Sequence, residues 1–398
     1  MVSISSLKPY IPKNPEEFCT NPYDIIGKEE ELELKKNPNS LIYLILPDGI
    51  GDEIYQNAKK ALERFKRDNL IIREKRPSIF VYRQESESFS HQGLILAISL
   101  KDYEAGNIVI HEHTREKPLE DRTKHIITTK VSAGLVWTVF KANRKINSII
   151  EKIKQKEPIL NFRKYNYQHL LWQETNYDII ESLRKLFKKE KLYIADGHHR
   201  AASAAAYRKN TKISHTQVSE NAPWQYFLSY VASDDQVRIL PYNRVIKKLP
   251  LNEHDFLARI KNDFEVITIE KPLNPSKKNE ITICLLGKWY KLVVKQIKFK
   301  SVRDSLDVAI LQDKILSPIL DISDPRSDEN IFFVGGYLSP ESMEKYVTEK
   351  GNDLFINLYP VSIRDLEKVG TEGNLMPPKS TWFDPKLLSG LVIHTLEE

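Results

Sequence analysis

The sequence predicts a mixed α/β fold with α+β character. Apolar runs typical of buried strands alternate along the chain with segments of helical apolar spacing, and several strands are joined as hairpins across short polar turns. Hairpins produce antiparallel pairs, so we do not expect a clean doubly wound sheet. At 398 residues, the chain is long enough for two or three domains, each with its own core.

The first half of the chain supplies many of the predicted strands. Within 52–68, Ile54, Ala58, Leu62 and Phe65 recur at helical spacing, which predicts an amphipathic helix. The elements expected up to residue 189 are, in order, a strand at 40–46, this helix, strands at 78–83 and 93–100 joined as a hairpin, a strand beginning at 108, a helix at 119–133, a strand at 135–141, and surface helices at 146–155 and 179–189.

The second half repeats the same alternation. Its last predicted hairpin turns at Leu286-Gly287. The expected elements are a strand at 192–195 followed by an alanine-rich helix, strand-like segments at 224–233 and 237–240, a helix at 251–264, strands at 264–269, 280–286 and 288–294, an amphipathic helix at 306–320, and a final strand, helix and loop at 353–361, 363–369 and 376–380.

The composition favours a folded cytoplasmic protein. Apolar residues make up 41% of the chain and charged residues 29%, as in globular proteins. The net charge of +6 is spread along the chain, so nucleic-acid binding is not favoured. Cys19 and Cys284 form neither a disulfide framework nor a metal-type spacing, which suits a reducing compartment. Residues 1–13 lack the apolar core of a signal peptide, and no apolar run approaches the roughly 20 residues that span a bilayer.

The junction between a short apolar strand and the alanine-rich helix is the strongest candidate site. An Asp196-Gly197 turn pair separates the two, and the side chains of His198, His199 and Arg200 follow at the helix start. A helix N-terminus offers free backbone N–H groups and partial positive charge, which suit phosphate. Two His and one Arg there oppose the helix dipole unless an anion compensates. We therefore favour phosphate binding over the alternative, an Asp N-cap followed by surface residues.

A second polar cluster, His-Glu-His-Thr-Arg at 111–115, follows a predicted strand, with an Asp-Arg pair at 121–122. Glu112 is suited to act as a general base toward a hydroxyl group. His111 and His113 lie on the same side of a strand, but no third ligand stands at a standard spacing, so zinc is not favoured. An exposed loop of mixed charge is the other interpretation.

A third cluster, Met-Pro-Pro-Lys-Ser-Thr-Trp-Phe, occupies 376–383. Two prolines stiffen this loop, and Lys379, Ser380 and Thr381 offer donors for phosphate or carboxylate. On spacing alone, a rigid connector with packed aromatic side chains is the favoured interpretation. The chain contains no G-x-G-x-x-G, P-loop, H-E-x-x-H, paired C-x-x-C or G-x-S-x-G motif, so these standard sites are not supported.

Taken together, these clusters resemble a widespread family of uncharacterised bacterial, archaeal and protist proteins, of the domain of unknown function 1015 type. The resemblance covers essentially the whole chain. The motifs that carry it are Asn21-Pro22-Tyr23-Asp24, His111-Glu112-His113-Thr114, Asp121-Arg122, Ala195 to Arg200, Leu306-Asp307-Val308, Asp324-Pro325-Arg326, Val334-Gly335-Gly336 and Met376 to Thr381.

The Asp-Gly-His-His-Arg motif, preceded by a His-Glu pair, is also similar to the free serine kinases of the ParB/sulfiredoxin-like superfamily. This resemblance implies transfer of a phosphoryl group from ADP or ATP, with Mg²⁺, to L-serine, in serine metabolism and cysteine biosynthesis. It implies a ParB/sulfiredoxin-like catalytic core at 106–235, flanked by an N-terminal α/β segment at 1–105 and a C-terminal α/β domain at 236–398. It fixes no oligomeric state.

The resemblance also assigns roles to residues. Glu112 is expected as the catalytic base, and Asp196 as its catalytic partner near the hydroxyl and the metal. Gly197, His198, His199 and Arg200 are expected to hold the nucleotide phosphates. The candidates for substrate binding are Arg115, Arg122, Lys379, Ser380 and Thr381.

Two alternatives remain open at this point. Water in place of serine would make the same site a phosphatase or nucleotide hydrolase. A nucleotide-responsive ParB-like regulatory or DNA-binding protein is the other, although the sequence has neither a helix-turn-helix signature nor a concentrated basic face.

Overall fold

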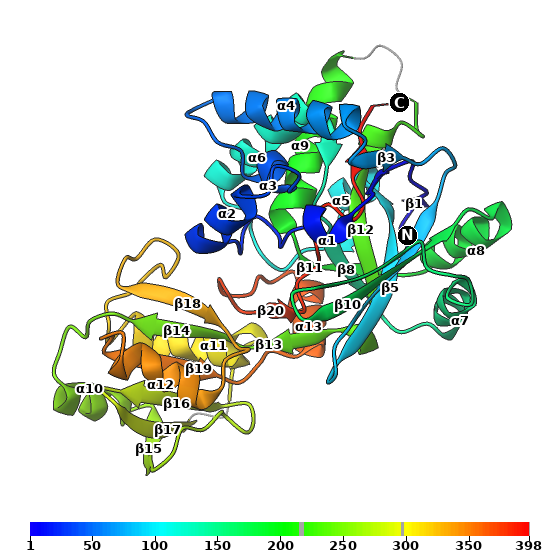
Figure 1. The fold of residues 1–398 in the computed structure, drawn as a ribbon. Helices are drawn as coiled ribbons and strands as arrows, with labels where there is room; N and C mark the ends of the chain where they lie inside the picture. The colour runs from blue at the N-terminus through cyan, green and yellow to red at the C-terminus, as the bar shows by residue number, and fades with distance from the viewer. Residues whose placement is uncertain (215–218, 296–297, 398) are drawn as a thin grey trace. The chain divides into compact units, whose positions relative to one another are not determined.

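The chain is a mixed α/β protein of two compact units. The computed structural model describes residues 1–214, 219–295 and 298–397 (Figure 1). The first unit combines Met1–Val237 with Pro385–Glu398, and the second is Arg238–Asp384. The first unit is therefore discontinuous, because the whole second unit stands between its two parts in the sequence. Among the described residues, no helix combines the length and apolar character needed to cross a membrane.

A sheet of nine strands, counted over the described residues, forms the centre of the first unit. Its order is β6-β11-β8-β12-β5-β4-β10-β9, and β1 pairs with β5. The β6–β11 and β8–β12 pairs are parallel, and the others are antiparallel. The strands are β1 (Ile4–Ser5), β4 (Ile79–Glu85), β5 (Ser90–Ser99), β6 (Ile108–Val109), β8 (Val136–Phe140), β9 (Leu160–Lys164), β10 (Tyr167–Glu174), β11 (Leu192–Asp196) and β12 (Tyr226–Ser233).

Helices and two short strand pairs complete the first unit (Figure 1). The pairs are β2 (Tyr10–Pro12) with β3 (Ile71–Arg73), and β7 (Val131–Ser132) with β21 (His394–Thr395). The helices are α1 (Pro15–Phe18), α2 (Lys28–Lys35), α3 (Ile42–Ile45), α4 (Glu53–Arg67), α5 (Leu100–Glu104), α6 (Glu116–Thr129), α7 (Arg144–Ile153), α8 (Tyr177–Phe187) and α9 (His198–Ser214), with 3₁₀ turns η1 (Pro223–Gln225) and η2 (Asp234–Gln236).

One apolar core joins the large sheet to helices α7, α8 and α9. In α7, Ile146, Ile150 and Ile153 recur at helical spacing and are buried in this core. The Asn143 side chain caps the helix by accepting a hydrogen bond from the Lys145 backbone N–H. In α9 the small side chains of Ala201 and Ala204 allow the helix to pack closely against the strands.

The second unit contains a six-stranded antiparallel sheet, with the order β15-β17-β16-β19-β14-β18, and a separate β13–β20 pair. The strands are β13 (Arg238–Leu240), β14 (Tyr242–Ile246), β15 (Phe264–Ile269), β16 (Glu280–Leu285), β17 (Lys288–Val294), β18 (Ile331–Gly335), β19 (Leu354–Leu358) and β20 (Trp382–Asp384). The helical segments are α10 (Glu253–Ile260), η3 (Arg303–Ser305), α11 (Asp307–Leu311), η4 (Gln312–Leu316), α12 (Pro340–Thr348) and α13 (Ile363–Thr371).

Most of the longer predicted elements are confirmed. The helices expected at 52–68, 146–155 and 179–189 are α4, α7 and α8. Both predicted hairpins are present, as the β4–β5 and β16–β17 pairs. The helix expected at 306–320 begins regularly as α11 but widens into the π-helical turn η4. Strands from 1–105 and from 106–235 pair within the same large sheet.

One predicted strand is wrong, and one hairpin was not predicted. The run 40–46 forms the short helix α3, because the Leu41 carbonyl accepts backbone hydrogen bonds from Leu44 and Ile45. A short, fully apolar run has no period that separates a strand from a buried helical turn. The β9–β10 hairpin turns at Tyr165 and Asn166, both with positive φ, and its tight turn lacks the glycine that signals such hairpins.

Candidate functional site

The two polar clusters predicted from the sequence meet at one edge of the large sheet. Strands β6 and β11 are parallel neighbours, with Ile108 opposite Leu192 and Val109 opposite Tyr193. The carboxyl ends of parallel strands lie at the same edge of a sheet. The 111–115 cluster follows β6 and the 196–200 cluster follows β11, so they emerge side by side.

The strand-to-helix turn has the tight geometry that the sequence predicts. Gly197 has a φ of +92°, a conformation that glycine adopts easily. A Cβ atom at Gly197 would lie 3.3 Å from both the Val136 Cα and the Arg200 Nη1. The Gly197 carbonyl accepts hydrogen bonds from the backbone N–H groups of Arg200 (2.9 Å) and Ala201 (3.1 Å), which closes the first turn of α9.

A pair of buried histidines joins the two clusters. The His111 backbone N–H donates to the His198 Nε2 at 3.4 Å, and the two rings lie 4.5 Å apart, edge to face. Burial lowers the pKa of His111 to about 4. The Ile194 carbonyl and the Asp196 charge act in the opposite direction but are weaker than burial. Burial also holds the pKa of His198 well below its ordinary value. Both imidazoles are therefore neutral at pH 7.

Asp196 is ionised and paired with a lysine that the sequence did not single out. Its Oδ2 lies 3.0 Å from the Lys386 Nζ. Burial alone would raise the pKa of this carboxyl, but Lys386 and Arg200 outweigh burial and hold the pKa below its usual range. A half-buried carboxylate is stabilised by a nearby cation, yet the sequence offers 60 Lys and Arg residues and no local signal that selects Lys386.

Arg200 connects the turn to the N-terminal Asn-Pro-Tyr-Asp motif. Its Nη2 donates to the Asp24 Oδ1 at 2.9 Å, and its Nη1 donates to the Leu135 carbonyl at 2.5 Å. Its Cζ lies 5.8 Å from the centre of the Tyr23 ring. Arg122 approaches the same ring, at 4.5 Å. The structure thus brings Arg122 and Arg200 together around Tyr23.

The residues around the start of α9 change the expected charge there. The sequence suggested that His198, His199 and Arg200 together required an anion. His198 is neutral, and Asp24 pairs with Arg200, so the positive charge at this end is smaller and is partly compensated within the protein.

The remaining candidates of the first unit differ in exposure. Glu112 is half-buried and directly follows His111. His199 is half-buried at the start of α9, whereas His113 and Arg115 are exposed. Arg115 is the N-cap residue of α6 and makes no side-chain cap hydrogen bond.

The third cluster belongs to the second unit, where it forms an ordered loop between α13 and β20. Lys379 has a positive φ of 55°, and the Ser380 Oγ donates to the Pro377 carbonyl at 2.5 Å. The buried Arg244 donates to the Lys379 carbonyl at 3.0 Å. Thr381 directly precedes β20, whose Trp382 packs edge to face on Tyr242.

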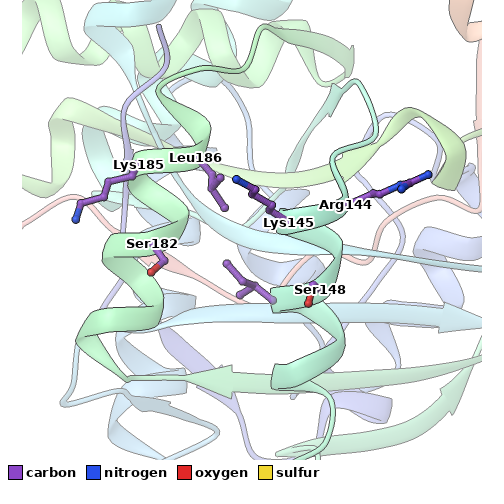
Figure 2. Close-up of a pocket in the computed structure, with 7 residues that line it drawn as sticks. Arg144, Lys145, Ser148, Ser182, Lys185 and Leu186 are labelled. Atoms are coloured by element: carbon purple, nitrogen blue, oxygen red, sulfur yellow. The ribbon is translucent and has the colours of Figure 1, made fainter.

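A pocket between α7 and α8 contains none of the predicted site residues. Figure 2 shows its lining, which comes from these two helices. The lining residues are Arg144, Lys145, Ser148, Ile149, Ser182, Lys185 and Leu186. The charged members are exposed, as expected for a shallow groove on a solvated helical surface.

Among the described residues, no group of three or more His, Cys, Asp or Glu side chains is arranged to hold a metal ion. Asp196 supplies a single carboxylate, half-buried and next to a cation. Mg²⁺ is commonly held by one or two carboxylates together with substrate phosphates. The donor set therefore fits a metal that arrives with a nucleotide.

Comparison with known proteins assigns a family. The family model described as "Protein of unknown function (DUF1015)" matches residues 8–309. No curated protein matches the chain. Three similar solved structures are a Glu-to-Gln variant of a free serine kinase in complex with AMP, a conserved hypothetical protein from Pyrococcus furiosus, and a C-terminally truncated SbnI from Staphylococcus aureus.

These structures are distant from the chain. The kinase variant is 12% identical with a TM-score of 0.39, covering 73% of this chain and 87% of its own. The Pyrococcus protein is 16% identical with a TM-score of 0.37, covering 76% and 95%. SbnI is 11% identical with a TM-score of 0.37, covering 74% and 85%. The family model spans most of the sequence, and the chain therefore belongs to the DUF1015 family of proteins of unknown function.

Proposed function

We propose that this protein is a nucleotide-dependent phosphotransferase that phosphorylates a small alcohol, namely free L-serine, from ADP or ATP. The observation that supports this best is the contact between His111 and His198, which joins the two polar clusters at one sheet edge. His111 is the sequence neighbour of the half-buried Glu112, and His198 follows the Asp196-Gly197 turn, which supports pairing these two carboxylates in the proposal. Phosphoryl transfer needs positioning and charge compensation more than a specialised nucleophile.

The proposal gives each group a role. Glu112 accepts the proton of the serine hydroxyl group. The hydroxyl oxygen of serine then bonds to the terminal phosphorus, and the bond from that phosphorus to the bridging oxygen breaks, so the shortened nucleotide leaves. Gly197, His198, His199 and Arg200 bind the phosphates at the start of α9, where backbone N–H groups are available. Since His198 Nε2 accepts a hydrogen bond, the neutral ring offers its Nδ1–H as a donor.

Mg²⁺, when bound, would be held by Asp196 together with the nucleotide phosphates and would neutralise phosphate charge. Lys386 and Arg200 keep Asp196 ionised, which is the state that a metal requires. The proposal keeps 106–235 as a ParB/sulfiredoxin-like catalytic core and adds Tyr23, Asp24 and Lys386 from outside it. We keep Arg115, Arg122, Lys379, Ser380 and Thr381 as proposed substrate-binding residues.

The test is a direct assay of the full chain with Mg²⁺, L-serine and either ADP or ATP, in which ³¹P NMR detects O-phosphoserine. We expect product with at least one nucleotide. A folded sample that forms none with either would overturn the proposal. A parallel reaction without serine measures nucleotide hydrolysis, and hydrolysis that serine leaves unchanged would indicate the hydrolase alternative.

A further inference from the structure

A small cavity lies beside Arg200 in the first unit. Its volume is ≈ 50 Å³, and its lining includes the polar residues Tyr23, Arg122, His125, Arg200 and Ser389. One water requires about 10–15 Å³ on this scale, so the cavity has room for a group of a few heavy atoms. It is too small for a nucleotide. Arg200 is shared with the turn of the candidate site, where its charge also acts on Asp196.

Each of the two arginines that line the cavity is paired with an aspartate that lies next to the lining rather than in it. Arg122 pairs with Asp121, with 2.6 Å between its Nη2 and the carboxylate, and Arg200 pairs with Asp24 at 2.9 Å. The two guanidinium groups also approach the same Tyr23 ring. Both arginine side chains are largely buried, with 13% and 12% of their surface exposed.

This pairing discriminates between classes of ligand. A polyanion would add negative charge beside Asp24 and Asp121 and compete with both carboxylates for the same two arginines. A ligand with one carboxylate and one ammonium group adds no net charge. Its carboxylate finds arginine donors and its ammonium finds aspartate acceptors.

The uncharged lining limits the size of the ligand. His125 Nε2 donates to the Leu44 carbonyl at 2.7 Å, and burial lowers its pKa to about 4, so the ring is neutral and adds no charge. The small residues Ala133 and Gly134 form another part of the lining. A Cβ atom at Gly134 would lie 3.2 Å from the Arg200 Cδ, which leaves little spare space there. The small volume therefore favours an amino acid with a short side chain.

We propose that this cavity binds the α-amino and α-carboxyl groups of a small amino acid, with Arg122 and Arg200 facing its carboxylate and Asp24 or Asp121 facing its ammonium group. The inference rests on the proposed function in that this amino acid would be the phosphoryl acceptor. It also selects among the predicted substrate-binding residues of the first unit: Arg122 lines the cavity, whereas Arg115 does not.

Calorimetric titration of the full chain tests the proposal, both without nucleotide and with ADP and Mg²⁺. The probes are glycine, L-alanine, L-serine, L-phenylalanine, propionate, ethylamine and inorganic phosphate. We expect the three small amino acids to bind, and phenylalanine and the two single-charge probes to bind at least about tenfold more weakly, since each lacks the fit or one charged hydrogen-bonding group. If propionate binds as tightly as serine, if phosphate does so while ADP and Mg²⁺ occupy the proposed nucleotide site, or if no small amino acid binds in either condition, the proposal is wrong.

Variants connect the binding to the cavity. Arg122→Met should weaken serine binding at least about tenfold, because one charged hydrogen-bond donor is lost. Arg67→Met is the matched control, since Arg67 also pairs with a neighbouring aspartate, Asp68, but 72% of its side chain is exposed. Gly134→Ala should weaken binding by narrowing the cavity while keeping every charge. Thermal unfolding verifies that each variant is folded, and Gly134→Ala decides the question if Arg122→Met does not fold.

The outcomes separate this inference from the proposed function. In one outcome, the wild-type protein binds serine, loses this binding in Arg122→Met, and yet makes no O-phosphoserine. That result would support the proposed amino-acid cavity and overturn the proposed kinase function. Formation of O-phosphoserine with an unchanged KM for serine in Arg122→Met and Gly134→Ala would support the kinase and overturn the cavity.

Discussion

The Lys386 ammonium group lies 3.0 Å from the Asp196 carboxylate, joining two residues that stand 190 positions apart. The main chain of Lys386 is held as well, because its carbonyl accepts a hydrogen bond from the Gln84 Nε2 at 3.1 Å. The Gln84 Oε1 accepts from His91 Nε2 at 2.9 Å, and His91 Nδ1 accepts from the Tyr230 hydroxyl at 3.0 Å. A buried chain of hydrogen bonds thus fixes the residue that keeps Asp196 charged.

Lys386→Met removes the closest cation from Asp196. The pKa of Asp196 should rise, because burial then acts with less opposition. If Asp196 acts as an anion in catalysis, the acidic limb of the pH profile for kcat/KM moves to higher pH, and turnover at pH 7 falls. A ¹³C NMR titration of the Asp196 carboxyl measures the same shift without any activity. Lys59→Met, on the exposed face of α4, is the control and should leave both unchanged.

Gln84→Leu breaks the hydrogen-bond chain at its middle while keeping a similar volume. The His91 Nε2–H and the Lys386 carbonyl each lose the hydrogen bond to Gln84. Loss of buried hydrogen bonds costs about 1–3 kcal/mol, so the free energy of unfolding should fall by roughly that amount. Urea unfolding monitored by circular dichroism measures it. An unchanged midpoint would show that water replaces the glutamine, and the chain of bonds would then carry little energy.

Glu112→Gln and Asp196→Asn test the two proposed catalytic carboxylates. Removal of a general base typically lowers turnover by about 10²–10⁴-fold, so we expect losses of this size in O-phosphoserine formation. Both replacements preserve the shape of the side chain, and unfolding temperatures should verify that the fold persists. Normal turnover in Glu112→Gln would remove this residue from the role of base.

Acid should destabilise the first unit well above the pH at which carboxylates titrate. Burial lowers the pKa values of His111, His125, His169 and His394 to about 4, whereas an unfolded histidine titrates near 6.5. The unfolded state binds more protons between these values, so stability is complete above pH 6.5 and is lost as the pH falls toward 4. Each histidine contributes a loss on the order of 2 kcal/mol by pH 5.

The combined loss approaches the roughly 5–15 kcal/mol that stabilises a typical domain. Thermal unfolding between pH 7.5 and pH 4.5 checks this expectation. A midpoint that stays constant down to pH 5 would mean that these histidines are reached by water and protonate without unfolding the protein.

Arg244→Met should loosen the Met-Pro-Pro-Lys-Ser-Thr loop of the second unit. Arg244 is buried and donates to the backbone carbonyls of Tyr242, Pro378 and Lys379, so one guanidinium group ties the middle of the loop to strand β14. Burial lowers the pKa of this group to about 9. We expect faster proteolytic cleavage within 376–381 in the variant, followed by mass spectrometry. Cleavage at the wild-type rate would show that the prolines and packed aromatics suffice.

The parts of the site that are local in sequence were predictable. The Asp196-Gly197 pair and the alanine-rich run after it determine a strand, a tight turn and a helix through short-range preferences, and the structure has these elements in order. The hairpin of β4 and β5 could also be predicted, since two strand-like apolar segments joined by a polar turn specify it.

The partners of the site were not predictable, because they come from distant parts of the chain. Nothing near Lys386 shows that it neutralises Asp196, and nothing near Tyr23 shows that two arginines approach its ring. The sequence also could not predict that His198 is neutral. Its lowered pKa depends on burial next to His111, which only the packed structure provides. The error at 40–46 has another cause, since a short apolar run suits either a strand or a buried turn.

The interruption of the first unit has a consequence for how the protein is made. A ribosome must synthesise 190 further residues after Asp196 before Lys386 exists. At about 5–20 residues per second, this delay is roughly 10 to 40 seconds. Once β12 has been made, all nine described strands of the large sheet exist, while Asp196 still lacks Lys386. The charge balance of the candidate site is therefore complete only after the whole second unit has been synthesised.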